Sequence, residues 1–167
     1  MLCYVIIEKM KKQANNLKLK SIKIIRKNMD GPGADIVEKL KLEKDWNLSC
    51  VISDKEKVIA DNGCSLQPEE IKFYVNAYEN RDTTVGEGFF VNNLHFDVHR
   101  FHPPLIYGRR GGPDDGEGIA LARYKPKAPE DGETYQYLLI TYLLPILSAK
   151  AVPQMVKFCE THMGTPE

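Results

Sequence analysis

A run of short alternating segments between residues 88 and 143 most constrains how this chain of 167 residues can fold. In the stretch GFFVNNLHFDVHR, the apolar Leu94, Phe96 and Val98 alternate with polar residues. Such period-2 alternation is typical of a half-buried strand, because successive side chains point to opposite faces of a sheet. Strand-like segments separated by turn-forming residues cover residues 88–92, 94–101, 104–108, 118–124 and 136–143. The sequence therefore predicts a sheet of antiparallel strands joined by short turns.

Helical patterns precede, interrupt and follow these strands. Residues 34–44 have apolar positions at helical spacing, and residues 47–53 and 57–61 then form a strand pair. Pro68 and two glutamates begin a helix that extends to about Tyr78, since proline and acids suit a first turn. Residues 151–163 have an apolar stripe typical of a terminal helix. This order predicts the α+β class, with one central antiparallel sheet flanked by helices.

Three histidines lie in the strand-like region and raise the question of a metal site. On a strand, His95 and His99 point the same way but lie roughly 13 Å apart, and His102 has the opposite parity. A zinc ion needs its ligands within about 2.1 Å of one point. The spacing therefore predicts no metal site there, and His95, Asp97 and His99 form a polar outer face.

The formal charge of zero is unevenly distributed along the chain. Residues 1–28 contain seven Lys and one Arg against one Glu, a charge of about +7. We divide the chain into a basic extension, residues 1–30, and a folded domain, residues 31–167. Residues 1–30 are either a flexible extension or an arm that meets anionic lipid or an acidic partner. The residues assigned to such contacts are Lys11, Lys12, Lys18, Lys20, Lys23, Arg26 and Lys27.

The cysteines indicate neither a disulfide framework nor a CxxC metal motif. Cys50 and Cys159 lie in apolar segments and are interpreted as core residues, and Cys64 as an ordinary loop thiol. This usage favours a reducing, cytoplasmic setting. The apolar start MLCYVIIEKMKK lacks the features of a signal peptide, and no segment has the ~20 apolar residues of a membrane span.

Several stretches, in order and over roughly residues 47–163, resemble the profilin family. LQPEEIKFYVNAY resembles the profilin segment FxPEE and the helix after it, and GEGFFVNNLHFDVHR resembles a strand–turn–strand of the type KYxVIR. LIYGRRGGPDDGEGIALARYK resembles IRGKKGxGGVTVKKT. YLLITYLLPILSAKAVPQMVKFCETHM resembles ALIFGIYDE followed by the terminal helix MVVERLGDYL. The resemblance implies a central antiparallel sheet with the N- and C-terminal helices packed on one face.

The resemblance also implies binding of monomeric actin, with no catalysis and no cofactor. The matching positions of the family's actin face are His95, His99, Arg100, Arg109, Arg110, Arg123, Lys150 and Gln154. Only Arg100 and the Arg109–Arg110 pair keep the usual residue type. Histidine in place of the family's lysine at position 95 predicts an actin affinity that changes between pH 6 and 8.

The polyproline site of the family departs more strongly from its pattern here. That site is an aromatic cradle between the terminal helices, which holds a proline-rich helix between ring faces. Its matching positions are Trp46, Ile59, His162 and Met163, and an isoleucine stands where the family commonly has a second-strand tryptophan. We therefore expect weak or altered polyproline binding.

Three function classes follow. The first is a monomeric, cytoplasmic, cytoskeletal protein that binds monomeric actin and regulates filament assembly. It would also bind proline-rich proteins weakly and meet phosphoinositides, with modulation by the extension, and no nucleic acid is expected as a partner. The second is a profilin-fold adaptor whose basic arm binds a membrane surface or nucleic acid, without actin binding. The third is an enzyme using Asp97, His99 and Arg100, which is disfavoured because alternation places Arg100 on the opposite face and no nucleophile–base pair is evident.

Overall fold

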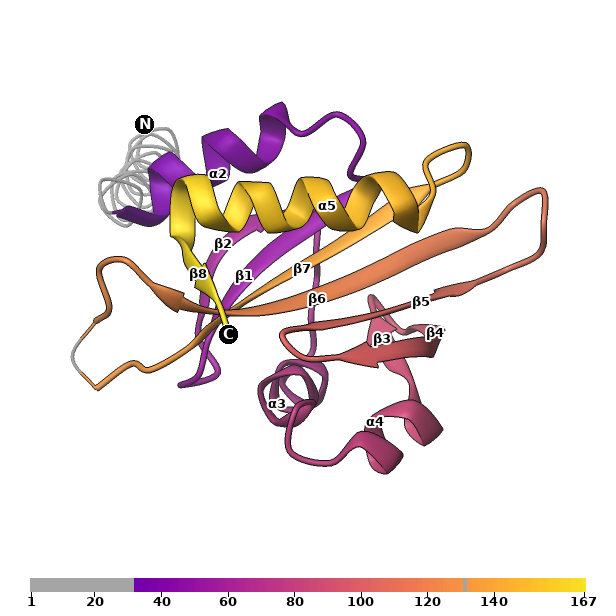
Figure 1. Cartoon of the computed structure of the whole chain (residues 1–167), viewed down its shortest axis with the longest axis horizontal. Coiled ribbons are helices and arrows are strands. Elements are labelled where there is room, and N and C mark those ends of the chain that lie inside the picture. Colours follow the sequence, from indigo (N-terminus) through magenta and orange to yellow (C-terminus); the bar gives the residue numbers. More distant parts are fainter. Residues whose placement is uncertain (1–31, 131) are drawn as a thin grey trace, which may run out of the picture. The chain divides into compact units, whose positions relative to one another are not determined.

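The computed structural model forms one antiparallel sheet with the strand order β2-β1-β7-β6-β5-β4-β3 (Figure 1). The structure describes residues 32–130 and 132–167, so the predicted extension, residues 1–30, lies outside the described residues. The strands are β1 (Leu48–Ser53), β2 (Val58–Asn62), β3 (Phe89–Val91), β4 (Leu94–His102), β5 (Leu105–Arg110), β6 (Glu117–Pro126), β7 (Gln136–Leu143) and β8 (Gly164–Pro166). The helices are α2 (Pro32–Leu42), α3 (Pro68–Asn76), α4 (Arg81–Glu87), α5 (Ser148–Phe158) and the short π-helix η1 (Cys159–Met163). The predicted α+β class is confirmed.

Each face of the sheet has its own hydrophobic core, because inward side chains alternate along the strands. On one face, which we call the α5 face, α2, α5 and η1 cover residues such as Ala120, Ala122 and Ile140. On the other, the α3 face, Tyr74 and Ala77 of α3 and its C-terminal cap pack against Ile119, Leu121 and Leu139. Figure 1 shows α5 and α3 on opposite sides of the strands. Burying both faces explains why the centres of β6 (IALA, residues 119–122) and β7 (LLI, residues 138–140) are continuous apolar runs.

The turns follow the chemistry of their residues. Asn92 and Asn93 between β3 and β4 both have positive φ, which asparagine tolerates better than most residues. The buried Glu70 of α3 braces this turn, since its carboxylate accepts hydrogen bonds from the Gln67 and Asn93 amides at 2.8 and 3.1 Å. This contact holds the start of α3 against the β3–β4 hairpin.

Several elements differ from the expectation. Helix α4 was not predicted, because RDTTVGE lacks an apolar stripe; Asn80 begins it by accepting a hydrogen bond from the Thr83 amide. Strand β8 was not predicted either; it pairs with the end of β6. Helix α5 begins at Ser148, three residues earlier than predicted. Leu94, expected on the buried face, is 43% exposed because it closes the β3–β4 turn.

A β-bulge in β4 changes which face its later residues occupy. Val98 pairs with Gly108 and Arg100 with Tyr107, so His99 is the extra residue. Paired residues share a face, and Tyr107 packs on the α5 side, so Arg100 also faces α5. The expectation that Arg100 lies opposite Asp97 and His99 is therefore wrong.

No helix among the described residues has the length and apolar character needed to span a membrane.

Candidate functional site

A basic hollow lies where β4 and β5 meet the start of α5. Its volume is about 290 Å³, and it is lined by His99, Arg100, Tyr107, Gly108, Arg109 and Ser148. The bulge brings Arg100 to this face, and its register partner Tyr107 forms part of the wall. Three of the residues predicted for actin binding, His99, Arg100 and Arg109, thus converge. The two guanidinium groups of Arg100 and Arg109 suit an acidic partner.

Apolar side chains border the same hollow. Leu147, at the start of α5, is 57% exposed and lines a small adjoining depression together with Arg109. Ser148 is held by a hydrogen bond from the Tyr142 hydroxyl, 3.0 Å between the oxygens. Cationic groups beside an exposed leucine are typical of a protein-binding surface. Tyr107, Leu147 and Ser148 were not predicted, because only the fold brings α5 to this strand pair. We call His99, Arg100, Arg109, Leu147 and Ser148 the basic surface.

Two other predicted actin-binding residues, Arg110 and Arg123, lie on the α3 face. The Arg110 guanidinium is 2.8 Å from the buried carboxylate of Glu117 and lies over the Phe96 ring. The Arg123 guanidinium lies 4.6 Å from the ring centres of both Tyr78 and Tyr135, and its Nε donates to the Glu167 carbonyl at 2.8 Å. Both arginines are thus committed to contacts within the fold, and neither lines the basic hollow.

Lys150 and Gln154 of α5 converge on one carboxylate in the loop between α2 and β1. The Asp45 Oδ2 atom lies 2.8 Å from the Lys150 ammonium and accepts a hydrogen bond from Gln154 at 2.8 Å. These hydrogen bonds from Lys150 and then Gln154 lower the pKa of Asp45. The pair therefore joins α5 to this loop in addition to any role in binding.

His95 lies further along β4, toward β3. Its Nε2 donates to the Glu87 carbonyl at 2.9 Å, its ring packs on Phe90, and its Nδ1 is 3.9 Å from the Asp97 carboxylate. The ring is half exposed, so a partner could reach it. It does not line the hollow that His99 and Arg100 share.

The four predicted polyproline residues converge on the α5 face. Trp46 and Met163 are buried in its core, and Ile59 packs against that core from β2. The rings of Trp46 and Phe158 lie 5.2 Å apart, and those of Phe158 and His162 lie 4.9 Å apart. Phe158 was not predicted as part of this group, although it lies one helical turn before His162.

Burial limits what this ring series can offer to a ligand. Trp46 and Phe158 are only 5% and 4% exposed, so their faces are used in the core. The indole Nε1 of Trp46 is buried and has no hydrogen-bond partner among the described residues. A ligand carbonyl could accept a hydrogen bond from this indole N–H, but helix α5 or the loop between α2 and β1 that carries Trp46 would first have to shift.

A second hollow, larger than the basic one, was not predicted. It has a volume of about 400 Å³ between α3 and α4, and its wall includes Phe73 and the carboxylates of Glu69, Glu79 and Glu87. A neighbouring hollow of about 290 Å³ extends it to the exposed ring of Phe90. This acidic groove could not be foreseen, because one of its walls is the unpredicted helix α4.

Solved structures similar to this chain include profilins. They include Acanthamoeba castellanii profilin IA, with a TM-score of 0.58 and 17% identity over 70% of this chain and 84% of that chain. Acanthamoeba castellanii profilin IB matches with a TM-score of 0.57 and 18% identity over the same shares. Schizosaccharomyces pombe profilin matches with a TM-score of 0.54 and 18% identity, over 70% of this chain and 86% of that chain. No protein-family model and no curated protein sequence matches the chain. The fold is therefore profilin-like, as the sequence motifs predicted.

Proposed function

We propose that this chain binds monomeric actin through the basic surface and regulates filament assembly, without catalysis or a cofactor. The observation that carries the proposal is the convergence of His99, Arg100 and Arg109 beside the start of α5, on a profilin-like fold. The family resemblance implies an actin face at these strands and this helix. A cytoplasmic location with the cytoskeleton follows from the proposal.

The geometry narrows the expected contact residues. His99, Arg100 and Arg109 form the centre of the proposed interface, and His95, Lys150 and Gln154 are candidates for its margin. Arg110 and Arg123 act through the stability of the α3 face, because their guanidinium groups are already engaged. The arginines of the hollow and those of the α3 face are therefore expected to differ in role.

Calorimetric titration against monomeric actin tests the proposal. We expect saturable binding near one-to-one, which the double substitution Arg100→Ala and Arg109→Ala weakens by at least about tenfold, since two charged contacts are lost. Arg81→Ala is the matched control, because Arg81 is exposed on α4 and pairs with its neighbour Asp82. Absence of binding by the full chain, or equal loss in the control, contradicts the proposal.

Weak polyproline binding is the second part of the proposal, supported by the ring series of Trp46, Phe158 and His162 and by the unpaired indole donor. A proline-rich peptide should bind much more weakly than to an open aromatic cradle. Trp46→Phe should weaken it further by removing the donor. Binding unchanged by this substitution would place the peptide elsewhere.

Residues 1–28 are proposed to contact phosphoinositides. Their charge also supports the alternative function, a profilin-fold adaptor that binds a membrane surface or nucleic acid. The charge of about +7 over residues 1–28 favours anionic surfaces. If the chain is instead an adaptor, binding to anionic vesicles or nucleic acid will be salt-sensitive and lost on deletion of these residues, and actin will not bind.

A further inference from the structure

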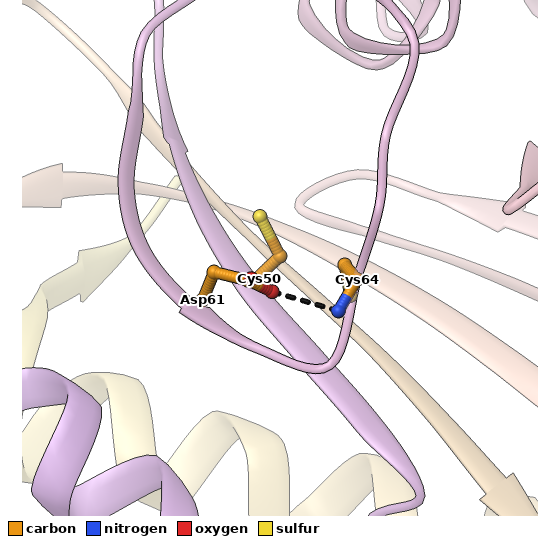
Figure 2. A group of neighbouring side chains, drawn as sticks. All are labelled: Cys50, Asp61 and Cys64. Carbon is orange, nitrogen blue, oxygen red and sulfur yellow. Dashed lines mark hydrogen bonds between the residues drawn. The ribbon is translucent and has the colours of Figure 1, made fainter. Parts of the chain in front are cut away.

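Two thiols and one carboxylate meet at the end of the β1–β2 hairpin. The Cys50, Asp61 and Cys64 ligand atoms all lie within 4.8 Å of one another (Figure 2). The sequence predicts Cys50 as a core residue and Cys64 as a loop thiol, without a shared site. These three residues have no CxxC motif by which the sequence could predict them, because they come from two strands and a loop.

The backbone explains why these three residues meet. Cys50 of β1 and Asp61 of β2 are directly paired in the antiparallel ladder, so their side chains share a face. Gly63, with a φ of +89°, then turns the chain so that Cys64 returns toward the strands. The Asp61 Oδ1 atom accepts a hydrogen bond from the Cys64 amide at 2.7 Å, shown as the dashed line in Figure 2. This bond fixes the carboxylate beside the second thiol.

We propose that Cys50, Cys64 and Asp61 bind a divalent transition-metal ion of the Zn²⁺ class. Thiolate and carboxylate ligands are the donors that such ions take in proteins, at about 2.3 Å for sulfur and 2.0–2.2 Å for oxygen. Tetrahedral ligands at those bond lengths lie roughly 3.5–3.8 Å apart, so the ligand atoms have to move closer together by at most about 1.3 Å.

The environment suits a site with three protein ligands and one open position. Both thiols are buried on the α3 face, at 1% and 8% exposure, whereas Asp61 is exposed to solvent. A metal ion can therefore enter past the carboxylate, and a water molecule can complete the tetrahedron. Binding releases the two thiol protons. Since Cys64 lies in the loop that leads to α3, the ion would join this loop to β1.

A disulfide is the rival use of two neighbouring thiols. It would require no carboxylate, whereas a metal site gives Asp61 a direct role. Asp61→Asn therefore distinguishes the metal site from the disulfide, because it should weaken metal binding and leave a disulfide unaffected.

Cobalt titration of the full chain, reduced and under argon, tests the proposal. The chain should carry Cys3→Ser, since Cys3 lies outside the described residues and could contribute a thiol. We expect one Co²⁺ ion to bind per chain, with thiolate-to-cobalt charge-transfer absorption and the visible bands of tetrahedral cobalt. One equivalent of Zn²⁺ should displace the cobalt.

Cys64→Ser should lose the charge-transfer band in part. It should weaken cobalt binding by more than the roughly 10–100-fold seen when a supporting group is lost. Asp61→Asn should weaken binding by at least about tenfold while the thiolate band persists.

Two matched controls complete the experiment. Cys159→Ala removes a buried thiol of the α5 face, and Glu56→Gln removes an exposed carboxylate of the β1–β2 turn; neither should change the titration. Thermal unfolding provides a second readout, because Zn²⁺ should raise the Tm of the parent chain and not that of Cys64→Ser. The proposal is overturned if the reduced chain shows no thiolate–cobalt band, or if the band and affinity survive in both Cys64→Ser and Asp61→Asn.

Discussion

Arg109 and Arg110 are neighbours in the sequence, yet strand β5 directs their side chains to opposite faces of the sheet, where they make different contacts. Arg109 lines the basic hollow, and its guanidinium donates to the main-chain oxygen of Gly112 at 3.1 Å. Arg110 neutralises Glu117, which is 4% exposed and also accepts a hydrogen bond from Asn47. Leaving a buried carboxylate without its cation is costly, whereas removing an arginine that has no ion-pair partner in the fold costs little.

This contrast predicts a separation of stability from binding. Arg110→Ala should lower the free energy of unfolding by about 2–4 kcal/mol, because it leaves the Glu117 charge without its ion pair. Arg109→Ala should change that free energy by less than about 1 kcal/mol and weaken actin binding instead. Urea denaturation and calorimetry of the two variants measure both quantities. Equal destabilisation by the two substitutions would contradict the assigned roles.

Gly108 lies opposite the bulge and has no room for a side chain. A Cβ atom there would collide with the main-chain oxygen of Asp97 and lie 2.9 Å from the Cα of Val98. Gly108→Ala should therefore displace β4, lower stability by about 1–3 kcal/mol and disturb the position of Arg100. Gly86→Ala on α4 is the control, because a Cβ atom added at Gly86 would meet nothing within 4 Å. A stable Gly108→Ala protein with unchanged actin affinity would show that the bulge does not matter for binding.

Residue patterns also decide how much of the site can be predicted from sequence. Alternation alone places Arg109 and Arg110 on opposite faces, so their separation follows from the strand pattern. The position of Arg100 does not, because a bulge adds one residue without leaving a mark in the hydrophobic pattern. The partners of Arg123 are Tyr78 and Tyr135, far apart in sequence, and only tertiary packing brings them together.

Among the elements, strongly patterned segments were predictable and weakly patterned ones were not. Strands β4 to β7 and helix α3 were expected close to their observed bounds, since each has a clear hydrophobic period. Helix α4 and strand β8 escaped prediction because they are short and polar, and their stability comes from a cap and from pairing with β6. The acidic groove between α3 and α4 was missed for the same reason.

The contact between α5 and the α2–β1 loop should depend on pH. Hydrogen bonds from Lys150 and Gln154 lower the pKa of Asp45, so the carboxylate adds stability above its ordinary pKa of about 3.9. That contribution is lost as the pH falls through the lowered, folded-state pKa. Asp45→Asn should therefore remove part of the acid dependence of the free energy of unfolding, measured by urea denaturation from neutral to acidic pH. Lys150→Gln should reduce the same part of the curve, and identical curves for parent and variants would refute the linkage.

For the whole molecule, the pH dependence of actin binding tests the role of the polar strand face. Histidine is the side chain that changes charge most readily near neutral pH, so an interface that uses His95 and His99 should bind actin with an affinity that differs between pH 6 and pH 8. The double substitution His95→Gln and His99→Gln should flatten the difference seen by calorimetry. His102→Gln, at the exposed end of the same strand, is the control that should retain it. A flat profile for the parent chain would remove these histidines from the interface.

The basic extension is tested by its removal. If it modulates a domain that binds actin by itself, the chain without residues 1–28 should still bind near one-to-one, with an affinity less sensitive to salt, because about seven positive charges are gone. Titration of both forms at low and physiological salt measures this difference. Loss of all actin binding on truncation would instead make the extension the principal binding element.

The burial of Trp46 has an optical consequence. It is the only tryptophan of the chain and is packed against Phe158, which in turn contacts His162. Its fluorescence therefore reports on the rings of Trp46, Phe158 and His162, which include no residue of the basic surface. The Cys50 and Cys64 thiols belong to the core of the α3 face. A proline-rich peptide without aromatic residues should shift this emission, whereas a metal ion at the hairpin should leave its wavelength unchanged. The emission of one unlabelled sample can thus tell whether a ligand has reached the rings around Trp46.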